Sequence, residues 1–192
     1  DLHVRSRRQR QMCIRDRGIL APVKSSTLKN NVASYLRDKE DRWFALSMRA
    51  RTIVVNSKKV APKTTLSYEA LATKPWRGRL CLRTSKKVYN QSLVAMLIDQ
   101  HGRSKAKEIV AGWVKNNVEI FSNDTAALKA VAAGRCDATI VNTYYFGRLQ
   151  KKNPKLSLRI VWPSQKSGGV HVNVSGCLLY TSDAADDSLR VD

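Results

Sequence analysis

Apolar and polar residues alternate along most of the chain with two periods, and the order of these periods predicts the order of strands and helices. Short apolar runs rich in β-branched residues, typical of covered strands, lie at residues 80–82, 118–121, 137–141 and 156–162. Apolar residues at helical spacing lie between them, at residues 91–101, 104–116 and 124–133. Strands that alternate with helices of this length predict an α/β unit with a mostly parallel sheet.

Residues outside this unit predict further elements. Strands are expected at residues 43–46, 50–56 and 170–174. Residues 57–65 are polar, basic and contain a proline, which suits a connection between two lobes. A short helix is expected at residues 67–73, with Ser67 as its N-cap.

Residues 136–149 join a predicted buried strand to two adjacent tyrosines. Asn142 and Thr143 are natural helix N-cap residues, so Tyr144 and Tyr145 should open a helix at the carboxyl end of the strand. In open α/β sheets this edge is where ligands bind. The stretch is therefore the first candidate for a binding site.

The two ends of the chain differ in character from its interior. Residues 1–17 and 177–192 can be back-translated into nucleotide strings that, apart from a frame offset, are reverse complements of each other. The shared string resembles the transposon end and index adapter used in preparing sequencing libraries. We expect both ends to be adapter-derived and non-native, and we exclude them from fold prediction. A genuine arginine-rich arm and acidic tail are the alternative.

The chain is strongly basic, with a formal net charge of +20. The two ends together hold seven Arg and six Asp, so the net charge of residues 18–176 is +19. Such a charge raises nucleic acid or an anionic surface as a partner. However, Lys and Arg are scattered through every predicted element and no basic run is interleaved with stacking aromatics, so a solvated, lysine-rich surface is preferred.

Two of the four cysteines, Cys81 and Cys136, lie between the excluded ends, each at the start of a predicted strand. If those strands are neighbours, a disulfide is feasible and would suit an oxidising compartment such as the periplasm. Two buried free thiols are the alternative. The interior has neither a Cys-x-x-Cys motif nor a histidine cluster, which disfavours a zinc site.

Three loops at the carboxyl ends of predicted strands carry groups that could meet in one cleft. They hold Thr84, Ser85 and Tyr89; Asn123; and Asn142, Tyr144 and Tyr145. A trivalent hard cation can displace a phenolic proton and bind the oxygen left behind, so tyrosines without thiolates or paired histidines favour Fe(III). Ordinary packing at a helix start is the more common role of such a tyrosine pair.

Arg49 and Arg51 lie on one predicted strand with their side chains on the same face, because strand periodicity is two. A fork of this kind could hold carbonate or phosphate beside a metal. A solvated edge strand is the alternative. His171, alone in a predicted strand, is expected to be structural.

Several short runs, in collinear order over nearly all of residues 18–176, resemble the periplasmic ferric-iron-binding proteins of ABC transporters. These runs are Asn30-Asn-Val with Leu36-Arg-Asp, Arg42-Trp-Phe with Arg49-Ala-Arg, Tyr68-Glu-Ala-Leu-Ala, Trp76-Arg-Gly-Arg, Val88-Tyr-Asn-Gln-Ser-Leu, Ala132-Ala-Gly-Arg-Cys-Asp, Val141-Asn-Thr-Tyr-Tyr-Phe-Gly-Arg-Leu and Val170-His-Val-Asn-Val-Ser-Gly. As a set they are specific, although none would suffice alone.

The resemblance implies an α/β, type II periplasmic-binding-protein fold that closes around Fe(III) in the periplasm and serves an ABC transporter permease in the inner membrane. By matching motif, Tyr144 and Tyr145 correspond to the family's paired tyrosine ligands, and Tyr89 to a third tyrosine of one subclass. The resemblance also implies positions for a synergistic anion, carbonate or phosphate. These are Ser85, Asn123 and Asn142, as in some members, and Arg49 or Arg51, as in others.

Compared with the family's order of elements, the chain is expected to hold one nearly complete lobe and a remnant of the other. Residues 18–56 would be the remnant of lobe 1 with a crossing strand, residues 57–169 lobe 2, and residues 170–176 the return crossing strand. The family's first strand, with its His or His-Tyr ligand motif, would lie upstream of Gly18.

We therefore expect a monomeric iron-capture protein with no catalytic activity and no nucleic-acid partner. A basic nucleic-acid-binding domain is the alternative of a different class, and it rests on charge alone. An enzyme with Cys136 or Ser85 as nucleophile is disfavoured, because neither has a well-placed His or carboxylate partner in the sequence. A binding protein for another small anion or metal complex is a further alternative.

Overall fold

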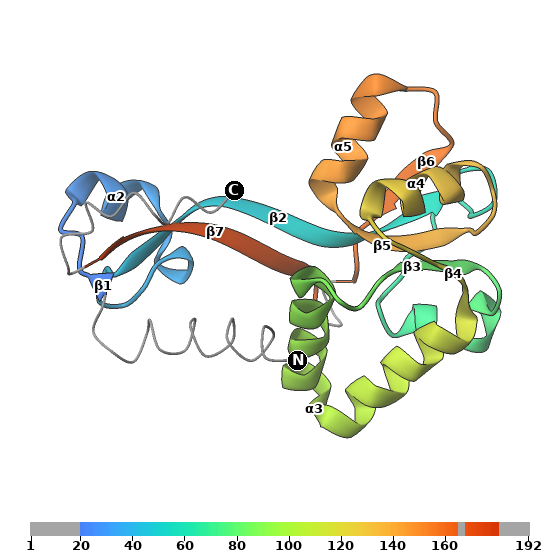
Figure 1. The fold of residues 1–192 in the computed structure, drawn as a ribbon, viewed down its shortest axis with the longest axis horizontal. Coiled ribbons are helices and arrows are strands. Elements are labelled where there is room, and N and C mark those ends of the chain that lie inside the picture. Colours follow the sequence, from blue (N-terminus) through green and yellow to red (C-terminus); the bar gives the residue numbers. More distant parts are fainter. Residues whose placement is uncertain (1–19, 165–167, 181–192) are drawn as a thin grey trace. The chain divides into compact units, whose positions relative to one another are not determined.

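The computed structural model describes residues 20–164 and 168–180 (Figure 1). They belong to two compact units, one containing residues 20–48 and 174–180 and the other Arg49–Asn173. Both boundaries lie within long strands, whereas the sequence placed the lobe boundaries near the strand ends, after residues 56 and 169. Each long strand thus contributes residues to both units.

The elements follow one another in an order that alternates strands with helices over most of the larger unit. They are β1 (Leu20–Ala21), α2 (Ser26–Asn31), the 3-10 turn η1 (Ser34–Leu36), β2 (Trp43–Asn56), the 3-10 turns η2 (Ala70–Ala72) and η3 (Lys74–Trp76), β3 (Leu80–Arg83), α3 (Val88–Asn116), β4 (Asn117–Phe121), α4 (Asp124–Ala132), β5 (Ala138–Asn142), α5 (Thr143–Lys152), β6 (Leu158–Val161) and β7 (His171–Tyr180).

The sheet of the larger unit places three strand ends side by side. Strand β3 lies between β5 and β4 and runs parallel to both. The carboxyl ends of β3, β4 and β5 therefore meet at one edge of the sheet. Arg51 of β2 lies at the same edge, because its register partner is Asn142, the last residue of β5.

The prediction of a mostly parallel sheet was wrong for one side of this unit. Strand β2 pairs antiparallel with both β5 and β6. It is inserted between two strands, β5 and β6, that the crossover helix α5 connects. The sheet is consequently mixed, although each βα step was predicted.

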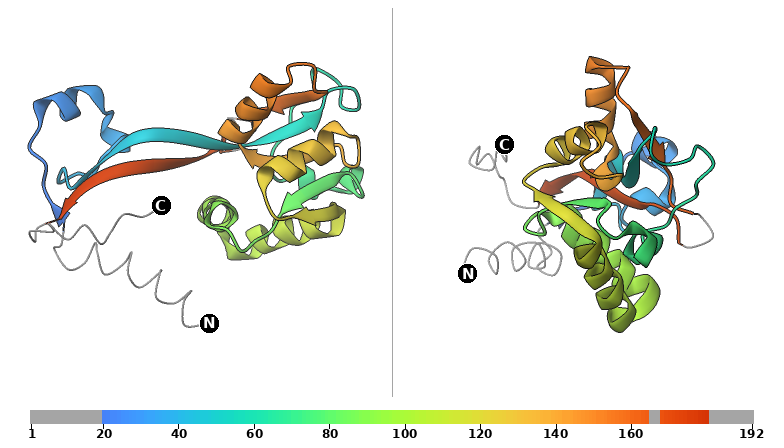
Figure 2. Two further views of the ribbon diagram at one scale, coloured as in Figure 1. Left: turned by 45° about the horizontal axis from the view of Figure 1, so that its top comes forward. Right: turned by 90° about the vertical axis from the view of Figure 1, so that its right-hand side faces the viewer.

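Side chains alternate between the two faces of this sheet, and an apolar cluster covers each face. On one face Ile53 shares a buried cluster with Leu97 and Trp113 of α3. On the other face Val54 shares a cluster with Leu128 of α4. Figures 1 and 2 show the resulting layers, with α3 on one side of the strands and α4 and α5 on the other.

The helix pair expected on either side of Gly102 is present as one element with a sharp break. Gly102 has a φ of 78°, outside the helical range, so α3 consists of two helices that meet at this residue. A residue with a side chain rarely adopts this conformation, which is why glycine ends the first helix.

Two other local predictions were wrong. Residues 43–46 and 50–56 form one continuous strand, β2, because the intervening residues 47–49 include neither glycine nor proline to interrupt the extended backbone. The helix expected at residues 67–73 is reduced to the 3-10 turn η2, although the Ser67 Oγ accepts the Ala70 N–H at 3.1 Å as a cap would. So short a segment gains too little from helical hydrogen bonds to propagate a full helix.

The smaller unit has little core of its own. Among its described residues only Phe44 and Ala45 are buried. Strand β7 continues six residues past the predicted end at Val174, and its last two residues pair antiparallel with β1. In the described part of the chain, no helix is both long and apolar enough to cross a membrane.

Candidate metal centre

The three tyrosines expected to bind metal are brought together at the carboxyl edge of the sheet. Tyr89 lies in the first turn of α3, and Tyr144 and Tyr145 lie in the first turn of α5. The Tyr144 and Tyr145 ring centroids are 4.1 Å apart, with 33° between the ring planes. The Tyr144 phenol also interacts with the phenols of Tyr145 and Tyr89. Residues 55 positions apart thus form one cluster of phenols.

The environment of Tyr144 keeps its phenol neutral. Burial raises the pKa of Tyr144, and hydrogen bonding with Tyr145 and Tyr89 raises this pKa further, whereas the Asn142 amide lowers it. Two guanidinium groups flank the cluster. Arg148 Cζ is 5.5 Å from the Tyr144 ring centroid, and Arg83 Cζ is 5.3 Å from the Tyr89 ring centroid. A guanidinium group over the face of an aromatic ring is attracted by the electron density of that face.

Asn142 does not make the helix-capping hydrogen bond that its sequence position predicts. It is the N-cap residue of α5, but its Oδ1 accepts from Arg51 Nη1 at 3.3 Å instead of bonding the first turn of the helix. Its Nδ2 is buried, and among the described residues it has no partner of full hydrogen-bond geometry. This amide group lies close to the Tyr144 phenol and lowers its pKa.

Arg51 is fully buried and all five of its N–H groups donate to protein acceptors. They bond Asn90 Oδ1 twice, at 3.0 and 2.6 Å, and Asp124 Oδ2, Asn142 Oδ1 and the Ile140 carbonyl once each, at 3.2, 3.3 and 3.1 Å. A guanidinium has only these five donors. Arg51 therefore has none left for an anion, and the predicted fork of Arg49 and Arg51 does not fit this geometry.

The other predicted anion residues lie at the same sheet edge. Ser85 is exposed in the loop between β3 and α3. Asn123 is exposed at the start of α4, where its Oδ1 accepts the Ala126 N–H at 2.9 Å. Arg49 is half-buried at the start of the larger unit's part of β2.

Cys81 and Cys136 form a disulfide in which both residues are buried. This observation decides between the two alternatives left open by the sequence. It also removes Cys136 as a nucleophile, because a disulfide sulfur carries no thiolate.

His171 is buried as expected for a structural residue. Its backbone N–H donates to the Tyr68 hydroxyl at 3.1 Å, and that hydroxyl donates in turn to the Arg51 carbonyl. Burial raises the pKa of Tyr68 to about 12. Unlike the phenols of the cluster, the Tyr68 phenol is committed to holding β2 and β7 together.

Sequence reasoning missed four residues that position the cluster: Arg83, Asn90, Asp124 and Tyr68. In the sequence, Asp124 is simply the first residue of the helix predicted at residues 124–133, and Asn90 is part of the motif around Tyr89. These residues are polar but occupy positions where the strand and helix patterns predict buried side chains. This mismatch is the signal that could have identified them.

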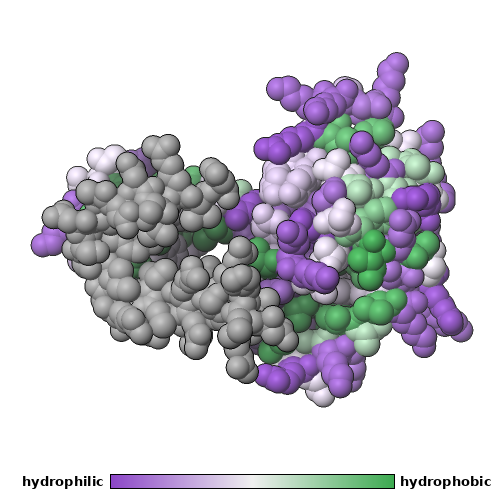
Figure 3. Space-filling model, viewed as in Figure 1, coloured by the Kyte–Doolittle hydropathy of each residue, from purple (hydrophilic) through white to green (hydrophobic). Residues whose placement is uncertain are grey.

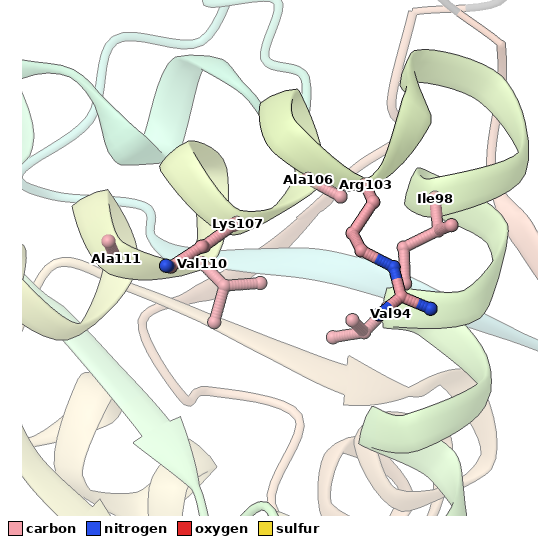
Figure 4. A pocket seen from close by; sticks show the side chains of 7 residues that line it. All are labelled: Val94, Ile98, Arg103, Ala106, Lys107, Val110 and Ala111. Atoms are coloured by element: carbon pink, nitrogen blue, oxygen red, sulfur yellow. The ribbon is translucent and has the colours of Figure 1, made fainter.

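One hollow of the larger unit lies elsewhere. It is a cavity of about 410 Å³ at the break in α3, and its seven lining residues all belong to that helix (Figure 4). None of the predicted site residues lines it. Within residues 20–164 and 168–180, no group of three or more His, Cys, Asp or Glu is placed to hold a metal.

Hydrophilic side chains are spread over the visible surface of the larger unit. In Figure 3 hydrophilic side chains are distributed across that face, with hydrophobic ones between them.

Comparisons with known proteins find relatives that are named for iron uptake. It is 42% identical over 166 residues to iron uptake protein A1 of Synechocystis sp. and 38% identical over 168 residues to iron uptake protein A2 of the same organism. These alignments cover 83% of this chain but 46% and 49% of the two relatives. The chain therefore spans about half the length of these curated relatives.

Solved structures of ferric-binding proteins have the same fold. The Trichodesmium protein IdiA (FutA), described as in complex with iron and citrate ligands, superposes with a TM-score of 0.79 at 39% identity, covering 90% of this chain and 57% of that one. The ferric binding protein from Campylobacter jejuni gives 0.78 at 32% identity, with the same coverage. These similarities confirm the predicted α/β, type II periplasmic-binding-protein fold.

The family match extends over most of the sequence. Residues 6–182 match the family described as "Bacterial extracellular solute-binding protein". The chain belongs to this family.

Proposed function

We propose that the whole protein captures Fe(III) through phenolate ligands from Tyr89, Tyr144 and Tyr145 and delivers it to an ABC importer. The observation that carries the proposal is the meeting of three phenols from α3 and α5 at one sheet edge. Fe(III) is a hard cation, and deprotonated phenolic oxygen is a hard ligand of matching charge. The names of the relatives, iron uptake protein and ferric binding protein, support this substrate.

Metal binding at this site is coupled to proton release. The pKa of Tyr144 is raised, so the phenol is protonated near neutral pH and must lose its proton when it binds iron. Each phenol that becomes a ligand releases one proton. The affinity for Fe(III) therefore rises with pH.

A synergistic anion completes the coordination in this proposal. The buried Asn142 Nδ2, which lies beside the Tyr144 phenol, can donate to carbonate or phosphate. Ser85 and Asn123 add a hydroxyl and an amide at the same edge, and Arg49 adds a positive charge. Arg51 is left out of this set because its donors are occupied.

The proposed compartment is the periplasm, and the proposed partner is a permease of the inner membrane. The buried Cys81–Cys136 disulfide suits an oxidising compartment. We propose a monomer that binds and releases its cargo without catalysis. Relatives that match the chain are binding proteins, which agrees with this role.

Fe(III) titration followed by visible absorption tests the proposal. A tyrosinate-to-Fe(III) charge-transfer band is expected for the wild-type chain, and it should fall by about two thirds or more in the double variant Tyr144→Phe, Tyr145→Phe, in which only Tyr89 remains. Tyr35→Phe is the matched control, because Tyr35 is 80% exposed and lies in the smaller unit. A band that keeps its full intensity in the double variant and falls in the control would contradict the assignment.

A further inference from the structure

Arg51 makes contacts that link the two helices carrying the tyrosines. Its Nε and Nη2 donate to Asn90 Oδ1 at 3.0 and 2.6 Å. Its Nη1 donates to Asn142 Oδ1 at 3.3 Å. Asn90 follows Tyr89 in the first turn of α3, and Asn142 is the N-cap residue of α5. One guanidinium therefore contacts the start of each tyrosine-bearing helix.

Asn90 fixes the start of α3 in a second direction. Its Nδ2 donates to the carbonyls of Arg83 and Thr84, at 2.8 and 3.2 Å. These carbonyls lie at the end of β3 and just beyond it. The Asn90 side chain thus ties the turn that bears Tyr89 to β3 through its amide nitrogen and to β2 through Arg51.

Asp124 completes the network on the side of α5. Its two carboxylate oxygens bond Arg51 Nη1 at 3.2 Å and Arg83 Nη1 at 3.1 Å. The oxygen that bonds Arg51 also accepts the backbone N–H of Asn142 at 3.0 Å. The backbone at the start of α5 is therefore held by the same carboxylate that holds Arg51.

The network is buried, which makes its geometry strict. The side chains of Arg51 and Asp124 are both fully buried, and that of Arg83 is 6% exposed. A buried polar group that loses its partner cannot turn to water, so the hydrogen bonds of Arg51 and Asp124 favour one arrangement of the elements that supply their partners.

We propose that Arg51 is a positioning residue that sets α3 and α5 in register, so that the phenols of Tyr89, Tyr144 and Tyr145 converge. Its use in metal capture rests on the proposed function, whereas its effect on phenol positions stands on the hydrogen bonds alone. Arg51 acts through Asn90 and Asn142 and does not touch the cargo. The role replaces the anion contact that its sequence position suggested.

The variant Asn90→Ala tests this inference. It removes the link between Arg51 and the Tyr89 turn and leaves the pairing of β2 with β5 in place. Asn116→Ala is the control: Asn116 is buried whereas Asn90 is half-buried, and the Asn116 Nδ2 also donates to two backbone carbonyls, those of Leu71 and Thr73. Both variants should lower the thermal unfolding midpoint, so stability alone does not distinguish them.

Two measurements on the 192-residue chain separate positioning from stability. Without iron, an NOE between the hydroxyl-side ring protons of Tyr89 and Tyr144 is expected in the wild type and in Asn116→Ala, and should be lost in Asn90→Ala. With Fe(III) supplied in excess as its nitrilotriacetate complex, the charge-transfer band of Asn90→Ala should fall by about a third, as expected when one of three phenolates is lost. The apparent Fe(III) affinity should fall about 10- to 100-fold, as is usual when a group that orients a ligand is removed.

A double-mutant cycle completes the test. If Asn90 acts by placing Tyr89, the variant Asn90→Ala, Tyr89→Phe should bind Fe(III) no more weakly than Tyr89→Phe alone. Additive losses, or a Tyr89–Tyr144 NOE that survives in Asn90→Ala, would overturn the inference. Arg51→Lys, which keeps the charge but not the five-donor fork, should also lose the NOE. A wild-type chain with the NOE but without the band would overturn the proposed function and leave the positioning role standing.

Discussion

Arg51 and Asp124 form an ion pair at 3.2 Å in which both side chains are fully buried. Arg83 bonds the second oxygen of the same carboxylate at 3.1 Å, so two guanidinium groups share one acid. Burial alone would favour the neutral form and lowers the pKa of Arg51, whereas Asp124 acts against this shift. The Asp124 carboxylate therefore allows two guanidinium cations, those of Arg51 and Arg83, to be buried together.

Replacing that acid should destabilise the larger unit. Asp124→Asn leaves Arg51 and Arg83 buried without a counter-charge, and breaking a buried pair from one side costs about 3–5 kcal/mol. Urea unfolding followed by circular dichroism would measure the change. Glu108→Gln is the control, because its ion pair with Lys105 has side chains 66% and 61% exposed and should contribute nothing measurable. Equal losses in the two variants would contradict the prediction.

The Cys81–Cys136 disulfide should contribute strongly to stability. It joins residues 55 positions apart, and closing a loop of that length in the unfolded chain stabilises the fold by about 4 kcal/mol on the loop-entropy model. Unfolding the chain with and without dithiothreitol measures this difference. Cys177→Ser, which removes an exposed free thiol, should leave the oxidised protein unchanged. Identical unfolding curves under both redox conditions would refute the estimate.

His171 should make the fold sensitive to acid. Burial first, and then the charge of Arg51, lowers the pKa of His171 in the folded chain. The unfolded chain, with a pKa of about 6.5, then binds more protons, so stability is present above about pH 6.5 and is lost as the pH falls through the folded pKa. The free energy of unfolding measured from pH 8 to pH 5 should fall less steeply in His171→Gln. Parallel curves for variant and wild type would count against this role.

Two glycines in helices should respond in opposite ways to alanine. A Cβ on Gly112 would lie 2.6 Å from both the Cβ and the carbonyl oxygen of Ala72, so the backbone must move and Gly112→Ala should cost about 1–3 kcal/mol. At Gly147, in the middle of α5, no described atom beyond its neighbours and its own helix backbone lies within 4 Å. Gly147→Ala should therefore stabilise by up to about 1 kcal/mol through helix propensity. Thermal melts of both variants decide the sign of each effect.

The chain as it stands should bind iron weakly. Among its described residues the smaller unit buries only Phe44 and Ala45, and the chain spans about half the length of the curated relatives. A site that cannot close around its cargo leaves the metal open to water and to competing ligands. Isothermal titration with ferric citrate should show no submicromolar binding. Tight binding by this chain alone would disprove the expectation.

Local sequence patterns predicted the parts of the fold that depend on local interactions. The strand at residues 137–141, the helix beginning beside Tyr144 and the break at Gly102 follow from β-branched runs, cap residues and a glycine with positive φ. The same patterns failed at residues 67–73, where a marginal helical segment was left as a 3-10 turn. They also failed at residues 47–49, which were expected to separate two strands but belong to one continuous strand.

Motif resemblance, rather than periodicity, favoured metal binding over packing for the tyrosines. Chemistry alone favoured packing for Tyr144 and Tyr145, and nothing in the spacing from Tyr89 to Tyr144 indicates that they meet. The meeting depends on β3 and β5 lying parallel and adjacent, which aligns the starts of α3 and α5.

The sequence by itself determined which residue types stand at the ends of three strands, because those ends are marked by local signals. Only the tertiary structure decided what Arg51 does. Its partners Asn90, Asp124 and Asn142 lie 39, 73 and 91 residues away along the chain. Alternation along a strand places a side chain on a face, but burial and the partners across that face decide whether a charge contacts solvent, an anion or a carboxylate.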